Sequence, residues 1–220
     1  MPTGMIFVEG HGEVKAVGNL VVRLWVHLGL ASEIAWKSPL RWPLLHLRRG
    51  IDGALALARQ ERPDLALILR DDEDGCPAES GPATARWVRE GNLPFPVSVV
   101  MAYREFETWF LPSIPRMAGQ PLPGVAGNRP GLSADTSTPA YPENIRGVKE
   151  WLSRHYSANR SYKATTDQLP LTQLINLDDL VRAGFVENNQ PGSVSSAGSL
   201  VRGLQFLSSN LGSAGSVYPK

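Results

Sequence analysis

Short apolar runs that end in acidic residues constrain the fold of this chain more than any other feature. Residues 65–69 are almost continuously apolar, and four acidic residues, 71–74, follow closely. A run of this kind is typical of a parallel strand covered on both faces. A second run, residues 5–8, is followed at once by Glu9 and a glycine turn. Both runs therefore predict buried strands that carry carboxylates at their carboxyl ends.

The segments between these strands change to a helical period. Apolar residues recur at helical spacing between residue 13 and Gly29, and further helices are predicted near residues 44–60 and 78–90. Residues 96–102 give a third strand. Strands that alternate with helices predict an α/β fold with a doubly wound, mostly parallel sheet flanked by helices.

Acidic residues follow all three strands, which places them at one edge of the predicted sheet. They are Glu9, the acids Asp71, Asp72, Glu73 and Asp74, and the pair Glu105 and Glu107. Oxygen ligands of this kind suit Mg²⁺ or Mn²⁺, which could activate water for attack on a phosphate ester. Glu9, directly at a strand end, is the better candidate general base or ligand, whereas Glu13 fits a helix-capping role.

Other interpretations of the acidic residues stay open. A run of charges is often only a solvated turn. Glu105 and Glu107 would share a face on a strand but diverge on a helix, so the pattern does not say which reaches the site. Asp72-Glu73-Asp74-Gly75 also resembles the nucleophile motif of haloacid-dehalogenase-like phosphatases, although Cys76 stands where threonine is usual.

The composition of the chain changes after residue 112, and the sequence predicts four parts. Residues 1–112 are the predicted α/β core, and 113–143 form a loop rich in Pro and Gly. Residues 144–207 are a predicted helical extension packed on the core, with helices near 144–155, 171–181 and 199–207. Residues 208–220 are a predicted flexible tail.

Composition excludes several classes of protein. The net charge is +1, so any nucleic acid would be bound through a local patch or a metal rather than a global basic field. The candidate phosphate contacts are Lys149, Arg49 and Lys163, although each could simply be a solvated surface charge.

The single cysteine, Cys76, excludes an internal disulfide framework and is expected as a small buried residue or a turn element. Without a signal peptide or a membrane span, a cytoplasmic location is expected, and an oligomer is compatible with the sequence.

Five motifs together resemble a known family. They are VEGHGE (residues 8–13), LRDDEDGCP (69–77), VMAYREFETWFLP (100–112), KEWLSR (149–154) and YKATTDQ (162–168). In this order they are similar to the bacterial domain-of-unknown-function family 4276. The first two also resemble the motifs of Toprim domains, which occur in topoisomerases, primases and overcoming-lysogenization-defect nucleases.

The Toprim resemblance implies a Rossmann-like parallel sheet and Mg²⁺-dependent phosphodiester chemistry. Glu9 would be the Toprim glutamate, and alignment through Cys76 and Pro77 makes Asp71 and Glu73 the acidic pair, with Asp72 an outward-pointing bystander. The implied catalytic residues are therefore Glu9, Asp71 and Glu73. The implied metal ligands are these three with Asp74, Glu105 and Glu107. Glu73 replaces the usual aspartate, which lengthens that ligand by one methylene.

The function implied is a nuclease or related phosphodiester-cleaving enzyme that acts on DNA or RNA. Relatives of this kind often look like bacterial defence components encoded near an ATPase of the ABC/AAA type, so such an ATPase is the implied protein partner. The alternative is a non-catalytic regulatory or binding subunit that keeps the fold and pairs with the ATPase.

Overall fold

The buried apolar strands form one sheet in which every strand pairing is parallel. The computed structural model describes residues 1–30, 33–124 and 129–220. Within these ranges the strands are β1 (Thr3–Val8), β2 (Ala35–Trp36), β3 (Leu40–Arg41), β4 (Leu65–Asp72), β5 (Val97–Tyr103) and β6 (Val217–Tyr218). Their order is β2-β1-β4-β5-β6, and β3 pairs with the carboxyl end of β1. The predicted α/β fold is confirmed.

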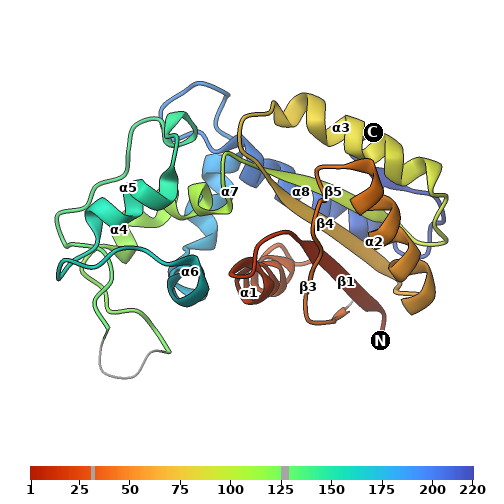
Figure 1. The fold of residues 1–220 in the computed structure, drawn as a ribbon, viewed down its shortest axis with the longest axis horizontal. Helices are drawn as coiled ribbons and strands as arrows, with labels where there is room; N and C mark the ends of the chain where they lie inside the picture. The colour runs from red at the N-terminus through yellow and green to blue at the C-terminus, as the bar shows by residue number, and fades with distance from the viewer. Residues whose placement is uncertain (31–32, 125–128) are drawn as a thin grey trace.

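Helices cover both faces of the sheet (Figure 1). The core helices are α1 (Glu13–His27), α2 (Arg48–Glu61), α3 (Pro77–Glu90) and α8 (Ser195–Ser209). Apolar side chains of α2 and α3 pack on one face of the sheet, and those of α1 and α8 pack on the other. β4 is central and buried on both faces, which explains its nearly continuous apolar sequence.

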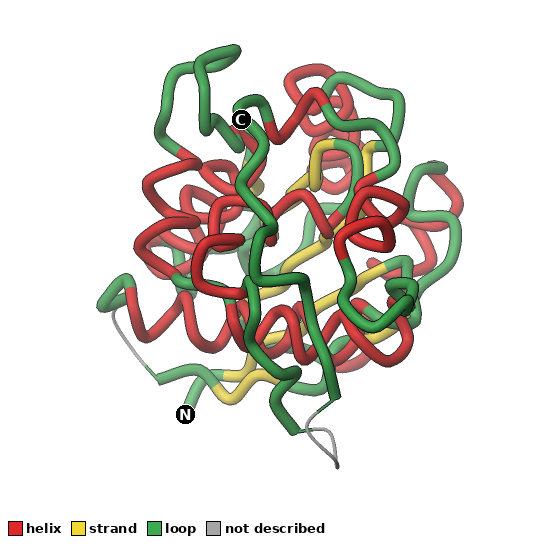
Figure 2. Tube along the Cα trace, turned by 90° about the vertical axis from the view of Figure 1, so that its left-hand side faces the viewer, coloured by secondary structure: helices red, strands yellow, loops and turns green. Residues whose placement is uncertain are grey.

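The remaining helices gather beyond the carboxyl ends of the strands, on the left of Figure 1. They are the 3₁₀ helices η1 (Phe106–Ser113) and η2 (Pro142–Asn144), with α4 (Ile114–Met117), α5 (Val148–His155), α6 (Ala164–Leu174) and α7 (Leu177–Gly184). Seen from that side in Figure 2, helices and loops lie in front of the strands. Their apolar side chains join the core on the α1 and α8 face. These helices therefore border the edge of the sheet where the acidic residues were expected.

Several predicted boundaries differ from the structure. The helix expected over 171–181 is two helices, because the chain breaks after α6 and Asn176 caps α7 by accepting a 2.9 Å hydrogen bond from the Asp179 N–H. α2 begins at Arg48 rather than residue 44, since Leu44 has a left-handed backbone (φ 63°). The predicted tail contains β6, which pairs with β5. Residues 125–128 of the predicted loop lie outside the described residues.

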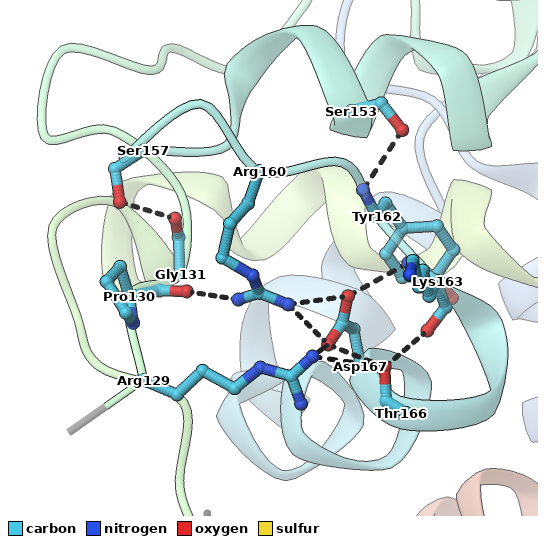
Figure 3. A network of polar contacts seen from close by, with 10 residues as sticks. All are labelled: Arg129, Pro130, Gly131, Ser153, Ser157, Arg160, Tyr162, Lys163, Thr166 and Asp167. Atoms are coloured by element: carbon cyan, nitrogen blue, oxygen red, sulfur yellow. Dashed lines mark hydrogen bonds and ion pairs between the residues drawn. The ribbon is translucent and has the colours of Figure 1, made fainter. Parts of the chain in front are cut away.

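A buried aspartate ties the Pro- and Gly-rich segment to α6 (Figure 3). Asp167 is fully buried, and its Oδ1 lies 3.1 Å from the guanidinium groups of both Arg129 and Arg160. Its Oδ2 accepts a 2.9 Å hydrogen bond from the Lys163 N–H. Arg160 also donates to the Pro130 carbonyl at 2.7 Å. Asp167 therefore has a structural role at the start of α6.

Asp167→Asn is expected to lower the free energy of unfolding by about 2 kcal/mol, because two guanidinium groups would lose their carboxylate partner. Chemical denaturation of the variant and the wild type measures the difference. Asp135→Asn, at an exposed position of the Pro- and Gly-rich segment, is the matched control and should leave stability unchanged. Equal stability of Asp167→Asn and wild type would contradict the structural role.

Candidate functional site

Five carboxylates line one cavity at the carboxyl ends of β1 and β4. The cavity has a volume of about 390 Å³, and its acidic lining residues are Glu9, Asp71, Asp72, Glu73 and Asp74. β1 and β4 are adjacent parallel strands, so their ends bring Glu9 and the acids of residues 71–74 together. His46 also lines the cavity, and its Nδ1 lies 3.2 Å from Glu9 Oε1. The predicted meeting of the first two acidic segments is confirmed.

The first two acids of the cluster belong to β4 itself, so they point to opposite faces of the sheet. Asp71 Oδ1 accepts a 2.8 Å hydrogen bond from the Phe106 N–H, on the side of the helical extension. Asp72 faces α3, where it accepts a hydrogen bond from the Ser80 hydroxyl, and its Oδ1 lies 3.5 Å from Arg70. Asp72 is only 5% exposed. The prediction that Asp72 points outward is wrong, because β4 continues two residues beyond Arg70 and the side chain packs towards α3.

Glu73 and Asp74 are exposed in the loop between β4 and α3. Asp74 Oδ1 lies 2.7 Å from Arg146 and 3.7 Å from Arg104. Asp74 thus already has two cationic partners, a feature that the sequence did not indicate. Cys76 is exposed and immediately precedes α3, so of its two expected roles only the turn element holds.

Both glutamates after β5 turn towards the same lysine. Arg104 has a left-handed backbone (φ 67°), Glu105 is extended, and η1 starts at Phe106, so the segment is neither a regular strand nor a regular α-helix. Lys149 Nζ lies 3.0 Å from Glu105 Oε1 and 3.6 Å from Glu107 Oε2. Because the backbone is irregular here, neither strand periodicity nor helix periodicity describes how Glu105 and Glu107 are oriented.

Glu107 is completely buried within a network of side chains from the helical extension. Its Oε1 accepts hydrogen bonds from the Tyr162 hydroxyl at 2.8 Å and from Gln168 Nε2 at 3.2 Å. Burial raises the pKa of Glu107 to about 7, against the opposing effects of Lys149 and the Tyr162 hydrogen bond. This carboxyl group therefore changes its charge near neutral pH.

Glu13 completes a group that we call the inner carboxylate cluster, which consists of Glu13, Asp71, Glu105 and Glu107. Glu13 is 6% exposed, and it accepts a 3.2 Å hydrogen bond from the N–H of Gly10, in the loop that precedes α1. Burial raises its pKa. Burial, together with the charges of Glu13 and Glu107, raises the pKa of Asp71 well above its usual value. The sequence did not predict that Glu13 belongs to this cluster. A glutamate in the first turn of a helix has the same sequence pattern whether it only interacts with the helix N-terminus or also belongs to a site.

The three candidate phosphate-binding residues have different surroundings. Lys149 is held by the inner carboxylate cluster. Although burial lowers its pKa, the charges of Glu107, Asp71 and Glu105 outweigh that effect and raise it, so Lys149 keeps its charge. Arg49 is exposed in the first turn of α2, and Lys163 is exposed before α6. Neither lines the carboxylate cavity.

The donor chemistry of the cavity suits a hard divalent cation, since carboxylate oxygens are the ligands that Mg²⁺ and Mn²⁺ prefer. Mutual repulsion in the inner cluster would also be relieved by positive charge. As the side chains stand, however, no group of three or more His, Cys, Asp or Glu residues in the described ranges is arranged to hold a metal ion. The oxygen donors are present, and a complete ligand shell would require side-chain rotation.

Fold and site together define an α/β protein with a carboxylate-lined cavity at the carboxyl ends of adjacent parallel strands. Over residues 8–185 the chain matches the model of the family described as "Domain of unknown function (DUF4276)". The match covers most of the chain, and the protein belongs to this family. Neither the curated proteins nor the solved structures yielded a significant match. Among the described residues, no helix combines the length and apolar character needed to cross a membrane.

Proposed function

We propose that this chain is a divalent-metal-dependent phosphodiesterase that acts on nucleic acid. The observation that carries the proposal is the cavity in which Glu9 meets Asp71 and its acidic neighbours. Carboxylates from two adjacent strand ends suit a site that binds a cation and, through it, a phosphate group. The similarity of VEGHGE and LRDDEDG to Toprim motifs supports the same chemistry.

In this proposal Glu9, Asp71 and Glu73 hold Mg²⁺ or Mn²⁺, which supplies charge neutralisation and a water of lowered pKa. Glu9 would also accept a proton from the attacking water, and its position in the cavity lining, with a side chain that is 25% exposed and contacts His46, supports this role. Asp71 is fixed by the Phe106 N–H, so its carboxylate is oriented before any ligand arrives. Asp74, Glu105 and Glu107 have cationic partners and would contribute through the local charge.

The proposal is tested with the purified chain, supercoiled plasmid, single-stranded DNA and RNA, each with Mg²⁺, Mn²⁺ or a chelator. We expect cleavage of at least one substrate, abolished by the chelator. Glu9→Gln should lower the rate by about 100-fold or more, as expected for loss of a general base or ligand. Glu33→Gln, at an exposed position, is the matched control and should cleave at the wild-type rate. Absence of cleavage with either metal, or equal rates for Glu9→Gln and wild type, would refute the proposal.

A second candidate function is a non-catalytic subunit that binds an ABC/AAA-type ATPase. The ion pairs of Lys149 and Asp74 favour it, because they neutralise carboxylates without any metal. Stable association with such an ATPase, without metal-dependent turnover, would support this function. The haloacid-dehalogenase-like alternative is disfavoured, since its nucleophile would be Asp72, which is buried and hydrogen-bonded to Ser80.

A further inference from the structure

A cavity of about 540 Å³ lies at the β6 edge of the sheet, between α3 and α8. Val99 and Met101 of β5 line it, together with Gly81 of α3, Ser199 of α8 and Tyr218 of β6. Its lining residues differ from those of the carboxylate cavity. It is therefore a separate feature of the molecule, which the proposed cleavage site does not explain.

The edge of β5 is unpaired along this cavity. β6 pairs with the first two residues of β5, and the Pro219 carbonyl then accepts a 2.8 Å hydrogen bond from Arg89, beside α3 (Figure 1). The Val97 N–H donates to the Ser216 carbonyl, on the β6 side. Alternate residues of a strand present their main-chain groups to the same neighbour, so the N–H and C=O of Met101 face that side too. Among the described residues these two groups have no hydrogen-bond partner.

The walls of the cavity leave room for one more main chain beside β5. A methyl group at Gly81 would lie 3.9 Å from Met101 Cγ, so α3 presents no side chain of its own there. Ser199, on the α8 wall, is also small. Neighbouring strands lie about 4.8 Å apart, which places the next strand position, in line with β6, inside the cavity. An extended peptide offers N–H and C=O groups at the spacing that this edge requires.

Arg202 gives the cavity a positive charge that no carboxylate neutralises among the described residues. It is exposed on α8, where its guanidinium group donates to Ser199 Oγ at 3.3 Å and lies 5.5 Å from the centre of the Phe185 ring. Glu187 also lines the cavity but forms no ion pair with it. Charge complementarity therefore favours a ligand that carries an acidic group.

We propose that this cavity, which we call the β5 groove, docks an extended segment of a partner protein. The segment adds a strand to the edge of β5 at Met101 and places an acidic side chain against Arg202. The carboxylate cavity is not involved, so the inference does not depend on the proposed cleavage activity.

Peptide binding to the full chain tests the groove. Short random peptides displayed on phage are selected on the wild type, and dissociation constants of the synthesised peptides are measured by fluorescence anisotropy. We expect the selected peptides to contain Asp or Glu, and to bind Arg202→Gln about fivefold or more weakly. Ser199→Leu, which narrows the groove, should weaken binding by about tenfold or more. N-methylation of the peptide should weaken binding only at alternate residues.

Two control variants make the same chemical changes outside the groove. Ser209→Leu is at the exposed end of α8, and Arg86→Gln is exposed on α3, and both should bind like the wild type. Hydrogen exchange followed by NMR reports on the edge itself. In the free chain the Met101 N–H should exchange faster than the Val100 N–H, which faces β4, and bound peptide should slow it.

Slow exchange of the Met101 N–H in the free chain would overturn the inference, because the edge would already be covered. Failure to select any peptide would overturn it, and so would affinities that ignore Ser199→Leu or N-methylation. Equal binding to Arg202→Gln and wild type would overturn the acidic chemistry of the ligand. Self-association of the wild type that Ser199→Leu prevents would replace the partner protein by a second copy of this chain. If Ser199→Leu does not fold, Arg202→Gln and the N-methylated peptides decide.

Discussion

Asp71→Asn is expected to lower metal-dependent cleavage by about 100-fold or more while leaving the folded chain at least as stable as the wild type at pH 8. Activity is expected to fall while stability does not, because the negative charge of Asp71 favours cleavage but disfavours folding. Asp71 contributes a negative oxygen to the cavity, but burial and the charges of Glu13 and Glu107 disfavour that charge in the folded state. The asparagine oxygen can still accept the Phe106 N–H, so the local backbone keeps its contact.

Cleavage rates and chemical denaturation curves of the same preparations measure both effects. Asp135→Asn makes the same chemical change at an exposed position and should alter neither quantity. A variant that loses activity together with stability would show that Asp71 is mainly structural. A variant that keeps the wild-type rate would show that the cavity does not use this carboxylate.

The second large effect concerns pH. Glu107 has a pKa of about 7 in the folded chain instead of 4.5, so the folded state holds its proton more tightly than the unfolded state. Its contribution to stability is complete below about pH 4.5 and is lost as the pH rises to about 7. The shift corresponds to about 3 kcal/mol. The raised pKa values of Asp71 and Glu13 change stability in the same direction.

We therefore expect the free energy of unfolding to fall between pH 5 and pH 8, and Glu107→Gln to remove a large part of this fall. Glutamine can still accept the hydrogen bond from Tyr162, so the variant should fold. Denaturant titrations at several pH values provide the measurement, and Glu33→Gln, at an exposed position, serves as the control. A wild type whose stability rises over this range, or a Glu107→Gln variant with an unchanged pH profile, would contradict the assignment.

Much of the core followed from local pattern. The strands at the three apolar runs and the helices α1 and α3 were predicted, because a strand or helix with a buried face has apolar residues at regular spacing in the sequence. The two-residue strands β2 and β3 were missed, since they carry no period. The break between α6 and α7 was missed because apolar residues continue across it, although Asn176 with acids two and three residues later is a recognisable capping signal.

Some residues of the candidate site could also be predicted from the sequence, whereas others could not. Strand ends supplied Glu9 and Asp71 directly, because parallel strands place their carboxyl ends at one edge. The side to which Asp72 points depended on where β4 ends, and helical or strand periodicity could not decide between Glu105 and Glu107. The partners of Glu107 come from α5, α6 and the loop between them, which are more than forty residues away in the sequence.

Periodicity and motif order are local properties, so the α/β class, the family and the edge of the sheet where the acids gather could be inferred from the sequence alone. The folded chain was needed to show which acids lie close together and which have a counter-ion. Charge interactions depend on distance and burial, and both arise when the helical extension packs against the ends of the strands. For this reason Lys149, a plain surface candidate in the sequence, is the central cation of the inner carboxylate cluster in the folded chain.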